Sequence, residues 1–214
     1  MPILTRTRLM LVLVPFVAAC AFSPTEGIMR ARVVNAGGTA VTVAAPAGFC
    51  IDEKLVDEAR TGAFVFLSDC ASNPETGGPT IARVPISAVL TASISNTGLP
   101  GSEAGTPKAL EQLQKFLETP FGQLTLSKSH NPATLTLLSI SRTDTAVYAY
   151  VEDRAQTTTT GESPRFWRAF TEVNGRLAAL SATGYNAADP EQARIQRILE
   201  AFVAAMQAAN QKPG

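Results

Sequence analysis

The dipeptide Asn174–Gly175 constrains the fold most, because it lies between two β-rich segments, residues 165–173 and 176–183. Asn and Gly both accept the positive φ angles of a type I′ turn, a favoured connection between antiparallel strands. The sequence therefore predicts a β-hairpin at this position. A second hairpin is predicted upstream, where residues 134–141 and 145–154 flank a short polar turn.

Two helices accompany these hairpins. Thr106 and Pro107 supply a capping hydroxyl and a proline at the first helical position, and three leucines then fall on one face: Leu110, Leu113 and Leu117. Pro120 and Gly122 interrupt this helix, and residues 123–126 fit a further helical turn or an extended segment equally well.

The C-terminal helix has the clearest boundaries. Asp189 is a capping residue, Pro190 occupies the first helical position and Gln192 completes a variant of the capping box. Apolar residues then recur at helical spacing up to Met206. This helix is expected to cover one face of a sheet.

The earlier part of the chain predicts three more strands, at residues 39–45, 63–67 and 84–94, with one or two helical turns at 52–60. Strands joined in hairpins make an antiparallel sheet. We therefore expect an α+β fold in which about six to seven antiparallel strands are packed by a middle helix and a long C-terminal helix. One such domain is expected to span residues 38–210.

The first 20 residues predict export. Arg6 and Arg8 precede an apolar run at residues 9–17, which has the length of a signal-peptide core and is too short to span a bilayer. Residues 17–20 (Val-Ala-Ala-Cys) resemble the bacterial lipobox, which implies a signal peptide at 1–19, a lipid on Cys20 and a tether at 20–37. An ordinary leader cut after Ala19 or Ala21 is the alternative. By the lipoprotein resemblance, Ala21 favours the outer membrane over the inner.

The cysteine count supports this assignment. If Cys20 carries a lipid, Cys50 and Cys70 remain in an oxidising compartment, where a disulfide is the economical pairing. A redox pair or a thiolate metal site is the alternative, but the two cysteines are not in a CxxC motif and His130 is the only histidine. We therefore expect neither a metal nor a cofactor.

Charge bears on the class of partner. The chain has 18 basic and 18 acidic residues. Loss of Arg6 and Arg8 leaves 16 minus 18, a mature charge of about −2. Such a protein lacks the electrostatic attraction that supplies most non-specific affinity for phosphate backbones, so nucleic acid is not an expected partner.

Two family resemblances follow from longer segments. Residues 166–185 followed by 189–209, with the early turn at 45–49, resemble the PsbP-like α/β sandwich. Residues 48–64 with Cys70 resemble uncharacterised exported lipoproteins of alphaproteobacteria. The first resemblance implies an accessory or assembly protein that acts by binding. Neither supplies a catalytic motif.

No catalytic motif emerges from the residues either. The chain has no G-x-S-x-G motif, no P-loop and no dinucleotide glycine fingerprint, and His130 is interpreted as a surface residue in a polar turn. The acidic residues that could pair are interpreted as solvated turns rather than hydrolytic or calcium sites. They are Asp52, Glu53, Asp57 and Glu58, and separately Glu152 and Asp153.

Aromatic residues offer a possible recognition patch. Tyr148, Tyr150 and Trp167 lie on adjacent predicted strands, where one alternating face is core and the other could line a groove. We expect a non-enzymatic envelope lipoprotein, held at the membrane by its lipid, that binds an envelope protein as an accessory or assembly factor. The alternative is a small-ligand-binding protein or a carboxylate-based hydrolase of the periplasm.

Overall fold

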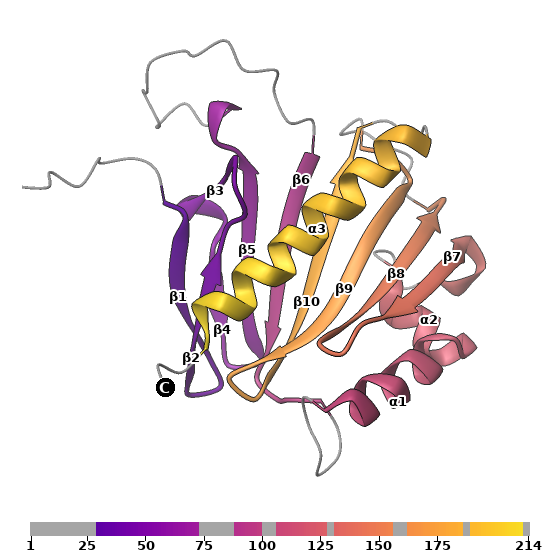
Figure 1. The fold of residues 1–214 in the computed structure, drawn as a ribbon, viewed down its shortest axis with the longest axis horizontal. Helices are drawn as coiled ribbons and strands as arrows, with labels where there is room; N and C mark the ends of the chain where they lie inside the picture. Colours follow the sequence, from indigo (N-terminus) through magenta and orange to yellow (C-terminus); the bar gives the residue numbers. More distant parts are fainter. Residues whose placement is uncertain are drawn as a thin grey trace, which may run out of the picture.

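The computed structural model describes residues 29–72, 88–99, 106–127, 131–155, 162–185 and 189–211. Its centre is a large antiparallel sheet (Figure 1). The strands of this sheet are β3 (Phe49–Ile51), β4 (Asp57–Ala59), β5 (Gly62–Asp69), β6 (Ala88–Ser95), β7 (Leu135–Arg142), β8 (Ala146–Asp153), β9 (Arg165–Val173) and β10 (Arg176–Gly184).

The spatial order of the sheet is β3-β5-β6-β10-β9-β8-β7. β4 also pairs with β5, at residues 62–64, whereas β3 pairs with residues 67–69 of the same strand. The described part of this sheet therefore has eight strands, more than the six to seven expected. The difference arises at residues 52–60, where a single 3-10 turn (Glu53–Leu55) is followed by β4 instead of by further helical turns. Pairing with β5 overrides the local helical preference of these charged residues.

A separate hairpin, β1 (Ala31–Ala36) and β2 (Thr39–Ala44), precedes the large sheet. Residues 31–36 therefore belong to the folded domain, although the predicted tether extended to residue 37. Val34 and Ala36 alternate with exposed neighbours and are buried, so this strand has an apolar face like that of β2. Gly37 and Gly38 connect the strands with φ angles of 58° and 82°.

Both predicted hairpins of the large sheet are present. Asn174 and Gly175 join β9 to β10 with φ angles of 50° and 71°, which are typical of a type I′ turn. β7 and β8 form the other hairpin, which has an irregular register between Leu137 and Ser139. The sequence therefore located these turns correctly from local chemistry.

Three α-helices are described: α1 (Pro107–Leu117), α2 (Pro120–Leu126) and α3 (Asp189–Ala209). Thr106 caps α1 through a bond from the Ala109 amide at 3.3 Å. Residues 120–126 form a helix of their own, which decides between the two alternatives left open by the sequence. Thr119 caps this helix at the Gly122 amide, at 3.0 Å.

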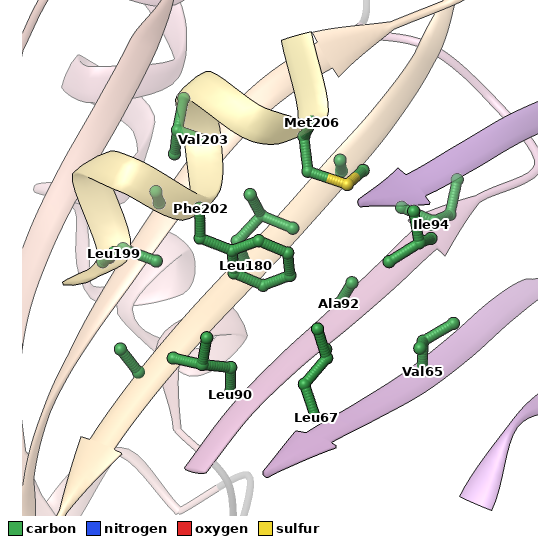
Figure 2. Packing of buried hydrophobic residues seen from close by; sticks show 14 of the residues in the cluster. Val65, Leu67, Leu90, Ala92, Ile94, Leu180, Leu199, Phe202, Val203 and Met206 are labelled. Carbon is green, nitrogen blue, oxygen red and sulfur yellow. The ribbon is translucent and has the colours of Figure 1, made fainter. Parts of the chain in front are cut away.

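The helices lie on opposite faces of the sheet and define two cores. On one face, α3 and the β1–β2 hairpin pack over β5, β6, β10 and β9. Figure 2 shows four α3 side chains of this core directed toward Leu180, Leu90 and neighbouring residues of the strands: Leu199, Phe202, Val203 and Met206. On the other face, α1 and α2 pack over β7, β8 and β9.

Candidate binding surfaces

The two downstream cysteines form a disulfide. Cys50 lies in β3 and Cys70 follows the last residue of β5, and their Cα atoms are 4.9 Å apart. The Cys50 side chain is fully buried, so the bond joins two neighbouring strands inside the domain. Cys20, the predicted lipidation site, lies outside the described residues, as does His130.

The predicted aromatic patch is part of the core. Tyr150 and Trp167 stack with ring centroids 4.8 Å apart and planes 15° apart, on the face that α3 covers. Trp167 is 8% exposed and Tyr148 is 7% exposed. Burial, with a smaller effect of Glu200, raises the pKa of the Tyr148 hydroxyl above its ordinary value. These rings stabilise the packing of α3 on the sheet and do not form a recognition surface.

The first acidic cluster is held by an arginine. Arg32 Nη1 donates to both carboxylate oxygens of Glu53 at 3.0 Å, and its Nη2 lies 3.5 Å from Glu58. The hydrogen bond to Glu53 raises the pKa of Arg32. The backbone N–H of Asn35 also donates to Glu58, at 2.9 Å. These carboxylates therefore fasten the β1–β2 hairpin to the β4 region and are not arranged as a catalytic pair.

The second acidic pair is divided between the surface and the interior. Asp153 is fully buried and accepts bonds of 2.8 Å from the hydroxyls of Ser127 and Thr134. Glu152 lies near Arg154 and Arg165 instead, at 3.2 and 3.7 Å. Within the described residues, no group of three or more His, Cys, Asp and Glu side chains could hold a metal ion.

Arg168 is a partly buried cation that binds several fixed acceptors. Arg168 donates from Nε to Ser181 at 3.0 Å, and from Nη1 to the carbonyls of Thr125 and Leu126 at 3.0 and 3.1 Å. Burial lowers the pKa of this guanidinium to about 10, and Asp153 opposes the shift. A cation at the last carbonyls of a helix is favourable, so Arg168 fastens the end of α2 to the sheet.

A shallow depression of about 350 Å³ lies on the sheet face turned away from α3. There α1 and α2 lie over β7 to β9, and the residues that line the depression come from β4, β5, β6 and β10 and the turn before β5. Phe64 is 38% exposed in this depression, although it belongs to the continuous apolar run at 63–67. Around it lie small or apolar residues, among them Ser93, Ser95, Leu177 and Ala179.

Further exposed apolar residues lie at the other end of the sheet. Phe116 and Phe121, at the junction of α1 and α2, are 38% and 71% exposed and meet edge to face with centroids 6.1 Å apart. Leu138, in β7, is 39% exposed. Sequence reasoning did not identify these residues, because exposure depends on what the rest of the fold packs against each side chain.

None of the described helices is both long enough and apolar enough to cross a membrane. The buried disulfide fits an exported protein, since such bonds persist in oxidising compartments.

No family model matches the chain, and no curated protein matches it significantly. Among solved structures, a point mutant of Mog1 and the Ran-binding protein Mog1p of Saccharomyces cerevisiae each align with 85% of this chain, at 12% identity and a TM-score of 0.39. The alignments cover 91% and 90% of those chains. The extracellular domain of PknH from Mycobacterium tuberculosis aligns over 69% of this chain and 64% of its own, at 10% identity and a TM-score of 0.31. Similarity this low carries no argument about function.

Proposed function

We propose that this chain is a non-enzymatic lipoprotein of the bacterial envelope that acts by binding another envelope protein. The N-terminal export segment and the lipobox resemblance at Cys20 support this location in the envelope. The Cys50–Cys70 disulfide fits the oxidising compartment that an envelope location implies. A lipid on Cys20 would hold the domain at the periplasmic side of the membrane, with the outer membrane favoured by Ala21.

The depression around Phe64 is the observation that carries the binding role. An exposed aromatic side chain on a rigid sheet is the usual form of a protein-binding anchor, because it adds contact area at a small cost in conformational entropy. The depression is too shallow to enclose most of a small ligand, as ligand pockets do. It therefore suits an apolar side chain presented by another protein.

The charged residue that borders this depression is consistent with a protein partner. Asp57 lines one side of it and is exposed, so a basic residue beside the apolar group of the partner would be complementary. The acidic pairs that a hydrolase would need are occupied instead: Arg32 binds Glu53 and Glu58, and two hydroxyls bind Asp153. No observation in the described residues favours the hydrolase or the small-ligand carrier.

Photo-cross-linking in the native envelope tests the binding surface. A photoreactive phenylalanine analogue would replace Phe64 and, in the control, Arg197, which is exposed on α3 on the opposite face. We expect a discrete cross-linked protein from position 64 only, identified by mass spectrometry. Identical products from both positions, or none from position 64, would contradict this binding surface.

The anchor needs its own test. Cys20→Ala removes the thiol that would carry the lipid, so the variant should leave the membrane fraction for the soluble periplasmic fraction. Mass spectrometry of the unsubstituted protein should show an acylated N-terminal cysteine. If Cys20→Ala still sediments with membranes, the lipobox interpretation fails, whatever the result at Phe64.

A further inference from the structure

The two ends of the large sheet differ in the length of their outermost strands. At one end β3 and β4 have three residues each, and very short edge strands are a common protection against pairing with other chains. At the other end β7 has eight residues and, among the described strands, pairs with β8 alone. Among the described residues, nothing pairs with the outer backbone N–H and C=O groups of β7. This edge is therefore able to accept another strand.

Exposed apolar side chains lie beside the same edge. Leu138 belongs to β7, and the Phe116–Phe121 pair lies at the junction of α1 and α2, both of which pack against β7 (Figure 1). Clustered exposed aromatic and aliphatic side chains mark interaction sites in soluble domains. Two independent features, an open backbone ladder and exposed apolar side chains, thus occur at the same end of the sheet.

We propose that β7 pairs antiparallel with β7 of a second copy of this chain, so that two large sheets join into one across a two-fold axis. Such an interface uses the same surface on both copies. A two-fold axis perpendicular to the sheet places the α1–α2 layers of both copies on the same face, on either side of the seam. Phe116 and Phe121 of each copy, at the junction of the two helices that pack against β7, would then lie near the seam and lose exposure to water.

The composition of β7 suits pairing with itself. Arg142, the last residue of the strand, is its only charged residue. An antiparallel arrangement puts the two copies of Arg142 at opposite ends of the ladder, so no like charges face each other. Mixed charges on α1, with Lys115 bonded to Glu111 at 2.6 Å, likewise give neither copy a repulsive surface of one sign.

The irregular register in β7 favours a second copy over an ordinary strand. The shift between Leu137 and Ser139 leaves Leu138 as an extra residue in β7, and such bulges disrupt pairing with a regular strand. A second copy brings the same irregularity. With the two-fold axis near Leu138, the two bulges meet each other and the regular segments on either side can pair.

Cysteine cross-linking in the intact envelope tests the geometry. With Leu138→Cys the two thiols would face each other across the axis, and a mild oxidant should give a product of twice the chain mass. Val33→Cys is the matched control, because Val33 is 62% exposed on β1, in the separate hairpin that packs near β4 and β5 and away from β7. A doubled product from position 138 and not from position 33 is the expected result.

Sedimentation of the full-length protein in detergent tests the energetics. The unsubstituted protein should dimerise reversibly, and Leu138→Lys and Phe121→Ser should each raise the dimer dissociation constant at least tenfold, while Val33→Lys leaves it unchanged. Phe121 is 71% exposed, so its replacement spares the monomer fold, which circular dichroism would verify.

A protein that stays monomeric at every concentration overturns the proposal. So does a Leu138→Cys product of a mass other than twice the chain, which would show a different protein at this edge. Neither result bears on Phe64, because Phe64 belongs to β5, which lies near the opposite end of the strand order from β7.

Discussion

At the scale of single residues, one amide side chain holds together segments that are far apart in the sequence. Asn210, at the end of α3, accepts a bond from the Thr42 amide at 2.9 Å and donates to the Thr42 carbonyl at 2.8 Å. It also donates to the Met206 carbonyl, at 2.7 Å, and accepts from Asn174, at 3.0 Å. Asn210 thus ends the helix and pairs with β2 as a neighbouring strand would.

Asn210→Ala should lower the free energy of unfolding by about 1–3 kcal/mol, because partly buried backbone groups of β2 lose their partners. Urea unfolding followed by circular dichroism would measure the loss. Gln196→Ala is the control, since the Gln196 side-chain amide donates to Glu200 in an exposed hydrogen bond and its loss should cost less than about 0.5 kcal/mol. Equal effects of the two substitutions would contradict this role of Asn210.

An ion pair in the first turn of α3 gives a pH-dependent contribution. Arg194 bonds to both carboxylate oxygens of Glu191. This hydrogen bond lowers the pKa of Glu191 below its ordinary value of 4.5, the charge of Arg194 adds to the effect, and burial opposes it. A carboxylate whose pKa is lower in the folded state stabilises the fold above its unfolded pKa, and this contribution is lost as the pH falls through the folded pKa.

Glu191→Gln should therefore reduce stability by about 0.3–0.5 kcal/mol near pH 7, a value typical of partly exposed helix pairs. The difference from the unsubstituted protein should shrink as the pH falls through the lowered pKa of folded Glu191, and it should vanish at an acidic pH below that pKa, where the carboxyl is protonated in both states. Unfolding in urea at the two pH values would measure it. A difference of the same size at both would show that the charge of Glu191 is not its cause.

Among the elements, the junction of α1 and α2 depends on a glycine. A Cβ atom on Gly122 would lie 1.9 Å from the carbonyl oxygen of Phe116 and 2.6 Å from its carbon. Gly122→Ala must therefore displace backbone, and we expect a loss of at least about 2 kcal/mol in unfolding free energy. Gln112→Ala, at an exposed position of α1, should be nearly neutral in the same thermal or urea experiment. A neutral Gly122→Ala would show that the two helices can separate freely.

The elements that the sequence located correctly carry their signal within a few residues. Asn174–Gly175 sets its own turn, and Thr106 with Pro107 sets the start of α1. Residues 57–59 were predicted as helix from local propensity. They form β4 instead, because pairing with β5 outweighs that propensity. β1 was assigned to the tether for a related reason, since its apolar face is short and its burial depends on β2 and on the more distant β4 and β5.

The candidate sites divide in the same way. The pairing of Cys50 with Cys70 follows from counting cysteines. Whether Trp167 and Phe64 are buried or exposed depends instead on which sheet face α3 covers. Alternating side chains along β5 and β9 indicate that each strand has two faces, but they do not indicate which face α3 covers. Local patterns therefore could not show that Trp167 is core and Phe64 is exposed.

For the whole molecule, the decisive feature is that one sheet separates two apolar cores. Leu199 of α3 is fully buried in one core, and Leu117 of α1 is 1% exposed in the other. Strands β8 and β9 contribute alternate residues to both cores, for example Tyr148 and Val147. Loss of either core would remove support from the shared strands, so the domain should unfold as one unit.

Leu199→Ala and Leu117→Ala should each cost about 2–5 kcal/mol, as expected for large cavities in well-packed cores. The only tryptophan, Trp167, reports on the α3 side, while far-ultraviolet circular dichroism reports on all helices and strands. In both variants the two signals should give the same single transition, including Leu117→Ala, whose cavity lies on the face away from Trp167. Leu55→Ala, at a position 49% exposed, is the control and should shift neither signal appreciably. If Leu117→Ala moved the circular dichroism transition and left the fluorescence transition in place, the two faces would unfold independently, and the sheet would not couple them.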